Sequence, residues 1–348
     1  MKVAVMSLVF TLAGGFAGVQ AASVILPEEW ASYVESFVLD DGRVVDTGNN
    51  GISHSEGQGY GLVLSVLADD RATFDRIWSF TSTELLVRDD GLASWRWDPD
   101  ASPHLTDTNN ATDGDILIAY GLALAGDTWG NEAFTERARQ IATTIGDSML
   151  VESDGLKAIL PGAVGFQRVD GIGPVLNTSY WVFEALPVFA QLDPSTDWDA
   201  VAEAGIELVR RSRMTASGVP PDWLVLDDDG AVRPAPDFPV EFGYNGIRIP
   251  LYMMRAGINP ALLEPFQQNA DSAGLYKIDP LTGERLEPIS EPGYQLIGAA
   301  MDCVAEGTVV REELRSMSPT SYYAATLQLL TLDYLRRNHP ACLAEAAT

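Results

Sequence analysis

Two kinds of helical segment alternate along the chain, and this alternation limits the fold more than any other feature of the sequence. In the first kind, apolar residues recur at helical spacing on one side only, as Phe74, Ile77 and Leu85 do, while Asp75 and Arg76 lie elsewhere on the segment. Such a stripe is typical of a surface helix with one buried face. Segments of this kind are 70–86, 131–149 and 198–212.

The second kind of segment is apolar almost all the way round, which is typical of a helix buried on every side. Segments of this kind are 57–68, 113–125, 178–190, 246–256 and 322–334. Because buried and striped segments follow one another in turn, we predict an all-α fold in which inner helices are wrapped by outer ones. A plain helical bundle is the alternative, but a bundle favours short loops, and the loops here are long.

The connections between these segments carry turn signals. Asp-Gly pairs at 90–91, 154–155 and 229–230 predict tight turns and small β-hairpins on the rim. No low-complexity linker divides the chain, so residues 22–348 are expected to form one domain.

The N-terminus has the pattern of a secretory signal. Lys2 precedes an apolar stretch over 3–18, and small residues end it at Ala21-Ala22. The stretch is too short and too rich in glycine to favour a membrane span. We therefore expect residues 1–21 to be removed and the mature protein to be periplasmic or secreted, without a membrane span.

Charge and composition exclude several classes of function. The net charge is −27, and removal of Lys2 with the signal makes it −28, so a nucleic-acid partner is not expected. Neutral sugars are compatible with this charge, and a cationic polymer would be attracted. His54, His104 and His339 form no HExxH pattern, so the sequence does not predict a catalytic zinc site. Two cysteines, Cys303 and Cys342, are able to pair only if the fold brings them together.

Polar residues stand where the buried segments begin. If the inner helices run parallel, these openings converge on one cleft, lined by Glu56, Asp113, Asp115, Asn245 and Arg248. Helix capping is the simpler explanation for any single Asp or Asn at such a position.

The opening at Glu56 differs from the others because two glycines follow it, Gly57 and Gly59. Two glycines in a first helical turn cost about 1 kcal/mol each relative to alanine. Something must therefore approach the backbone closely there, either a packed helix or a ligand.

Four ordered motifs resemble those of glycoside hydrolase family 8. They are Ser55-Glu56-Gly57-Gln58-Gly59-Tyr60-Gly61, Ala111-Thr112-Asp113-Gly114-Asp115, Pro221-Asp222-Trp223 and Tyr244-Asn245-Gly246-Ile247-Arg248. The resemblance covers residues 43–255. It implies an (α/α)6 barrel that hydrolyses cellulose, mixed-linkage β-glucan, xylan or chitosan with inversion, which agrees with the two rings predicted from the helix pattern.

The resemblance also implies roles for single residues. Glu56 is expected to donate the proton to the leaving oxygen, and Asp113 to hold the sugar in a distorted shape. Arg248 is expected to orient a carboxylate or bind a hydroxyl, with a structural ion pair as the alternative. Four aromatic rings are candidate sugar-stacking platforms, although such rings also occur in ordinary cores: Trp95, Trp97, Tyr180 and Tyr244.

One residue departs from the family pattern. Inversion needs a second carboxylate about 6.5–9.5 Å from the acid to activate water. Many family members have an aspartate directly after the tyrosine of the fourth motif, but this chain has Asn245, whose amide cannot act as a base. Glu241 is the preferred substitute because it lies just ahead of the same helix. The other candidates are Asp222, Asp237 and Asp113.

The sequence therefore predicts an exported, monomeric endo-β-1,4-glucanase that requires no metal or organic cofactor. Its expected substrate is cellulose or mixed-linkage β-glucan. A chitosanase or lichenase is an alternative, because Asn245 marks a separate branch and chitosan is cationic. A third alternative is a glucan-binding protein whose catalysis is attenuated by the loss of the aspartate.

Overall fold

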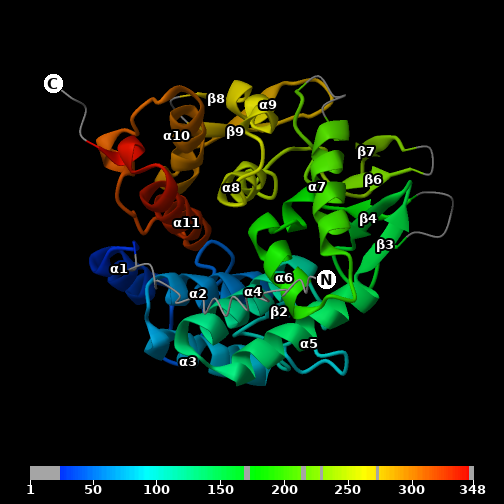
Figure 1. Ribbon diagram of the computed structural model, residues 1–348, viewed down its shortest axis with the longest axis vertical. Helices are drawn as coiled ribbons and strands as arrows, with labels where there is room; N and C mark the ends of the chain where they lie inside the picture. The colour runs from blue at the N-terminus through cyan, green and yellow to red at the C-terminus, as the bar shows by residue number, and fades with distance from the viewer. Residues whose placement is uncertain (1–23, 168–172, 213–216, 228–229, 272–273, 345–348) are drawn as a thin grey trace, which may run out of the picture.

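The computed structural model describes residues 24–167, 173–212, 217–227, 230–271 and 274–344. The helices lie in two layers around a common centre, as the (α/α)6 barrel requires (Figure 1). The predicted fold class is confirmed. The helices with the most completely buried side chains form the inner layer: α2 (Ser55–Leu67), α4 (Thr112–Trp129), α8 (Arg248–Arg255) and α11 (Tyr322–Asn338). Beside them lie α6 (Leu186–Leu192) and α10 (Pro292–Glu306).

The helices with a single buried stripe lie outside this layer. They are α1 (Pro27–Phe37), α3 (Arg71–Phe80), α5 (Glu132–Ser148), α7 (Trp198–Ser212) and the short α9 (Glu264–Gln268). Asp70 caps α3 by accepting a hydrogen bond from the Thr73 amide at 3.0 Å. A π-helical turn (Thr81–Leu85) extends α3, so the predicted segment 70–86 is helical with a change of geometry near its end.

The predicted bounds of one inner helix were wrong. The segment 178–190 contains two 3₁₀ turns, Thr178–Tyr180 and Phe183–Ala185, before α6 begins. Pro187 explains the late start, because proline lacks the N–H that an interior helical position donates but is tolerated in the first turn. The helix predicted over 246–256 also begins later, at Arg248.

Glycines bring α2 and α4 together. A Cβ added to Gly59 would lie 2.5 Å from the Leu117 Cβ, and one added to Gly121 would lie 2.8 Å from the Leu62 Cβ. Real side-chain atoms do not approach so closely, so these two backbones pack without intervening carbon atoms. The close approach predicted at Gly59 is therefore that of a packed helix.

Short antiparallel strands occupy the loops. They are β1 (Ser53–His54), β2 (Arg96–Trp97), β3 (Leu150–Ser153), β4 (Leu156–Ile159), β5 (Val175–Leu176), β6 (Leu224–Leu226), β7 (Val232–Pro234), β8 (Ala270–Asp271), β9 (Gly274–Ile278) and β10 (Arg285–Ile289). β1 pairs with β2, β3 with β4, β6 with both β5 and β7, and β9 with both β8 and β10.

The predicted turns at the Asp-Gly pairs have three outcomes. Asp154 and Gly155 form the turn between β3 and β4 with left-handed backbone, so that hairpin is confirmed. Gly91 is also left-handed, but it lies in a loop without a hairpin of its own. In the third pair, Gly230 is left-handed between β6 and β7, and Asp229 lies outside the described residues.

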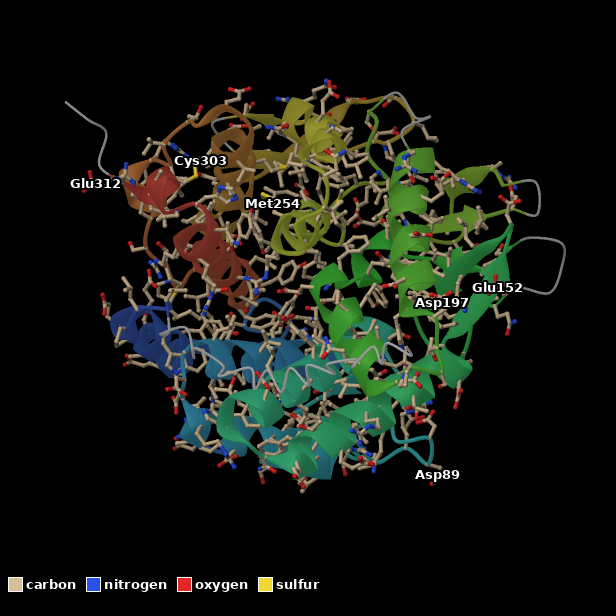
Figure 2. All side chains as sticks on the ribbon, viewed as in Figure 1. Asp89, Glu152, Asp197, Met254, Cys303 and Glu312 are labelled. Carbon is tan, nitrogen blue, oxygen red and sulfur yellow. A yellow bond between two sulfur atoms is a disulfide. The ribbon has the colours of Figure 1, made fainter. Side chains whose placement is uncertain are left out.

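Most of the core is one hydrophobic cluster that reaches from Ile25 to Cys342, and Val175, Val225 and Ala235 form a small separate cluster. Side chains such as Met254 fill the space between the helices (Figure 2). Cys303 on α10 and Cys342 form a disulfide, which joins α10 to the segment after α11. Among the described residues, every helix is too short or too polar to cross a bilayer. The predicted signal segment, residues 1–21, lies outside the described residues.

Candidate active site

The N-terminal ends of the inner helices open into one cleft of about 440 Å³. The predicted convergence of these ends is confirmed, because the cleft brings together residues from α2, α4, α8 and α11. It is lined by Asp46, Asn49, His54, Ser55, Glu56, Trp95, Ala111, Asp113, Tyr180, Tyr244, Asn245, Arg248, Tyr322 and Tyr323.

Arg248 links the two carboxylates that the sequence singled out. Its Nη1 bonds Glu56 Oε2, and its Nη2 lies 2.7 Å from Asp113 Oδ2 and 3.0 Å from the Ser179 hydroxyl. The side chains of Arg248 and Asp113 are 2% and 3% exposed, whereas that of Glu56 is 20% exposed. Glu56 is thus the member of this triad that a substrate can reach from solvent.

Burial shapes the electrostatics around this triad. Burial raises the pKa of Asp113, and the nearby charge of Glu56 raises it further, while Arg248 opposes both. Burial and the charge of Asp113 also raise the pKa of Tyr180 well above its ordinary value. The guanidinium carbon of Arg248 lies 5.6 Å from the centre of the Tyr180 ring. The Tyr180 hydroxyl therefore stays protonated where it lines the cleft.

His54 joins the first turn of α2, which carries Glu56, to a further carboxylate that the sequence did not single out. His54 Nδ1 accepts a hydrogen bond from the Gly57 amide at 3.0 Å, and Nε2 lies 3.4 Å from Asp46 Oδ2. Burial alone would lower the pKa of His54, but the bond to Asp46 and the charges of Glu56, Asp46 and Asp113 raise it. The two partners assign the ring proton to Nε2, where it faces Asp46.

The position usually held by the base is occupied by an amide whose oxygen and nitrogen each have a hydrogen-bond partner. Asn245 Oδ1 accepts a hydrogen bond from Asn177 at 3.2 Å, and its Nδ2 lies 3.4 Å from Asp222 Oδ2. Asp222 is itself buried behind Asn245, where it accepts hydrogen bonds from the amides of Gly243 at 2.8 Å and Gly246 at 2.9 Å. Asp222 shapes the turn before α8 and does not line the cleft.

Two other predicted bases, Glu241 and Asp237, also lie outside the cleft lining, whereas Asp113 lies within it. Glu241 Oε2 is 3.3 Å from Lys277 Nζ, and Asp237 is exposed in a turn with left-handed backbone. Asp115, which we expected in the cleft, is fully buried on another side of α4. Residues two apart on a helix point in different directions, so Asp113 and Asp115 cannot both face the cleft.

Three of the four candidate stacking rings line the cleft, namely Trp95, Tyr180 and Tyr244. Trp97 does not. His104 stacks on its ring at 4.3 Å between centroids, and the Arg43 guanidinium carbon lies 4.6 Å from the ring centre. These neighbours take up the ring surface that a sugar would need.

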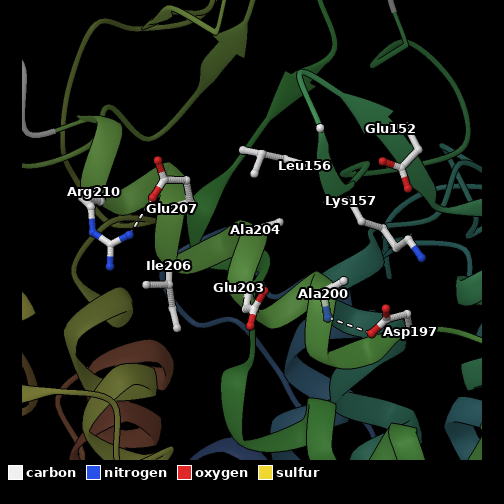
Figure 3. A pocket seen from close by; sticks show the side chains of 11 residues that line it. Glu152, Leu156, Lys157, Asp197, Ala200, Glu203, Ala204, Ile206, Glu207 and Arg210 are labelled. Atoms are coloured by element: carbon white, nitrogen blue, oxygen red, sulfur yellow. Dashed lines mark hydrogen bonds and ion pairs between the residues drawn. The ribbon is translucent and has the colours of Figure 1, made fainter.

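A larger hollow of about 660 Å³ lies on the outer wall, between α7 and the β3–β4 hairpin (Figure 3). Three of its charged residues are engaged by one another or by the backbone. Glu207 Oε2 lies 2.6 Å from Arg210 Nη1, and Asp197 accepts a hydrogen bond from the Ala200 amide at 3.0 Å. None of the residues predicted to act on substrate lines this hollow.

Comparison with known proteins identifies the family. Residues 4–337 match the family described as glycosyl hydrolases family 8. The chain belongs to glycoside hydrolase family 8. It is therefore a glycoside hydrolase, as the four motifs predicted.

Relatives in family 8 are similar over most of their length. A probable endoglucanase from Novacetimonas hansenii is 35% identical over 328 residues, which are 92% of this chain and 94% of that protein. An endoglucanase from Cellulomonas uda is 35% identical over 72% of this chain and 70% of its own. The solved endo-β-1,4-glucanase from Acetobacter xylinum has a TM-score of 0.81 and 34% identity, covering 89% of this chain and 97% of that one.

Within this family 8 enzyme, sequence reasoning missed four residues of the cleft: Asp46, Asn49, Tyr322 and Tyr323. Asp46 lies in a loop before α2, where the main chain of Asp46 pairs with that of Ile52. Tyr322 and Tyr323 begin α11. The buried segment 322–334 was recognised, so the rule that inner helices open into the cleft would have placed both tyrosines there.

Proposed function

We propose that the protein is an exported endo-β-1,4-glucanase that hydrolyses internal bonds of cellulose or a related β-glucan with inversion. The observation that carries this proposal is the cleft in which Arg248 joins the partly exposed Glu56 to the buried Asp113. The endoglucanase relatives, at 35% identity, support the same substrate class.

The proposed chemistry assigns each group one task. Glu56 donates a proton to the leaving glycosidic oxygen. Asp113 binds hydroxyls of the distorted sugar, and Arg248 fixes both carboxylates. Trp95, Tyr180 and Tyr244 offer aromatic surface to sugar rings. General acid catalysis of this kind contributes roughly 10²- to 10⁴-fold to the rate.

Export to the periplasm or the medium is proposed from the N-terminal pattern, with residues 22–348 as one mature domain acting as a monomer. The disulfide between Cys303 and Cys342 supports this location, because disulfides persist in oxidising compartments.

The test measures reducing ends released from carboxymethyl-cellulose, barley β-glucan and chitosan. We expect release from the first two substrates, and Glu56→Gln should lower it by about 10²- to 10⁴-fold. Binding of cellotetraose, measured by calorimetry, should change little in that variant. Glu152→Gln, an exposed carboxylate on the outer wall, is the matched control and should retain full activity. Full activity of Glu56→Gln would refute the assigned acid.

A chitosanase is the second candidate, favoured by the net charge of −27, which attracts a cationic polymer. Faster release from chitosan than from β-glucan would establish it. Oligosaccharide binding without turnover of any substrate would instead identify a glucan-binding protein.

A further inference from the structure

Asn245 leaves the proposed hydrolysis without a base at the usual position, yet the cleft contains a carboxylate on another element. We propose that Asp46 is the general base that takes the proton of the attacking water, with His54 as its positioning residue. This inference rests on the proposed function, since it completes the same reaction.

The cleft lining, within the described residues, holds three carboxylates: Asp46, Glu56 and Asp113. Two of them share the guanidinium of Arg248. Asp46 is instead held by His54, and its side chain is 22% exposed, so water reaches it. Of the three, Asp46 is therefore the carboxylate that is both accessible and separate from the group that contains the acid.

The surroundings of Asp46 fix its carboxylate and leave it able to accept a proton. Oδ1 accepts a hydrogen bond from the Gly48 amide at 3.0 Å, and Oδ2 faces His54 Nε2. Because His54 Nδ1 is already an acceptor for Gly57, its one proton points toward Asp46. A carboxylate offers about four lone-pair positions, so two remain for water.

Tyr322 provides an independent sign that a polar group binds beside Asp46. The Tyr322 side chain lines the cleft and is 1% exposed, and its hydroxyl has no hydrogen-bond partner among the described residues. Buried hydroxyls are normally paired, so the missing partner comes from the cleft contents. The Tyr322 ring lies 5.5 Å from the His54 ring, measured between centroids, and His54 is the residue that holds Asp46. Burial raises the pKa of Tyr322, and the charges of Glu56 and Asp46 both add to this.

The proposed step is balanced. Water bonded to Tyr322 attacks the anomeric carbon while Asp46 removes one of its protons. The bond from that carbon to the glycosidic oxygen breaks, and Glu56 protonates the departing oxygen. Asp46 ends protonated and Glu56 ionised, and exchange with solvent restores both. The product carries the inverted configuration because water enters opposite the leaving group.

The experiment compares Asp46→Asn with the parent on barley β-glucan and on β-cellotriosyl fluoride. Fluoride leaves without help from an acid, so Glu56→Gln should recover much of its turnover on the fluoride, whereas Asp46→Asn should stay about 10²- to 10⁴-fold below the parent on both substrates. Asp40→Asn, an exposed carboxylate of the same N-terminal segment, is the matched control and should behave as the parent does.

Rescue by azide is a second measurement, and it distinguishes loss of the base from loss of folding. In Asp46→Ala, azide should restore turnover of the fluoride and yield α-cellotriosyl azide, a product that a merely unstable variant would not form. For His54, the Ala variant should lower kcat without raising KM, and His54→Gln, which keeps an N–H, should restore part of kcat.

The outcomes separate the two proposals. Asp46→Asn with activity within about threefold of an active parent would overturn the base assignment alone, as would an inactive Asp46→Ala that forms no α-azide. A parent inactive on every glucan would overturn the proposed function and this inference together.

Discussion

Replacing Asp115 by asparagine should change how the stability of the protein depends on pH. Asp115 is fully buried, its Oδ1 accepts a hydrogen bond from the Ala93 amide at 2.7 Å, and its Oδ2 accepts one from Asn110 at 2.9 Å. Burial raises the pKa of Asp115 to about 7 even though both hydrogen bonds oppose the change. The group matters for the cleft because Ala93 precedes Trp95 in the same loop.

The sign and size of the effect follow from this pKa. The folded value of about 7 exceeds the ordinary value of 3.8, so between these values the folded protein holds a proton that the unfolded chain has lost. Stability from this group is therefore full at low pH and is lost as pH rises toward 7. When the pH rises from 5 to 8, this destabilisation grows over the two pH units below the folded pKa of about 7 and then stops growing. The free energy of unfolding therefore falls by about 3 kcal/mol over this range.

Urea unfolding at pH 5, 6, 7 and 8 measures this contribution. The Asn variant lacks the titration but carries a constant loss of about 1–3 kcal/mol, because its amide N–H faces the donor of Asn110. The stability of Asp115→Asn relative to the parent should therefore rise by about 3 kcal/mol from pH 5 to pH 8. Other titrating groups cancel in this difference. Asp127→Asn, an exposed carboxylate on the same helix, should show a flat difference, and a flat difference for Asp115→Asn would refute the reasoning.

Three further changes test the packing of the barrel by urea unfolding. Gly59→Ala places a methyl group against Leu117 and should cost about 1–3 kcal/mol, and no loss would show that α2 and α4 can separate freely. Cys342→Ala opens a disulfide of sequence separation 39 and should cost about 4 kcal/mol by the loop-entropy estimate, with parent and variant becoming equal under reducing conditions. Arg255→Met removes the ion-pair partner that lies 2.6 Å from Glu184, and it should lower the free energy of unfolding by about 3–5 kcal/mol. Its kcat on β-glucan should stay within about threefold of the parent, because this ion pair lies outside the cleft lining.

The layered fold was predictable from the sequence because a helix that is buried on all sides has apolar residues around its whole circumference. α4 is buried along most of its length, and its sequence is apolar round the whole helix. Gly59 was equally informative, because a glycine lowers the stability of a helix and is expected there only when another group packs closely against the backbone. The segment 178–190 failed because its apolar residues were counted without regard to Pro187, which permits a helix to begin but not to continue.

The cleft was predictable where a helix start marks it, and not elsewhere. Glu56, Asp113 and Arg248 stand at the starts of α2, α4 and α8, so one rule placed all three. The same rule placed Asp115 in the cleft wrongly, because it ignored the direction in which successive helical side chains point. The rule was also not applied to α11, and Tyr322 and Tyr323 were missed for that reason alone.

Asp46 had no such signal, because loop residues reach a site through turns whose shape depends on contacts distant in sequence. Its carboxylate is fixed by the Gly48 amide and by His54, and His54 in turn is fixed by Gly57. The amide at Asn245 shows the opposite case. The identity of residue 245 alone indicated that the usual base is missing. Its hydrogen bonds, in contrast, join it to Asn177 and Asp222, which are 68 and 23 positions away in the sequence. A departure from a motif can therefore be read from sequence, whereas a candidate to compensate for it is identified only from the folded chain, which brings Asp46 to the same cleft.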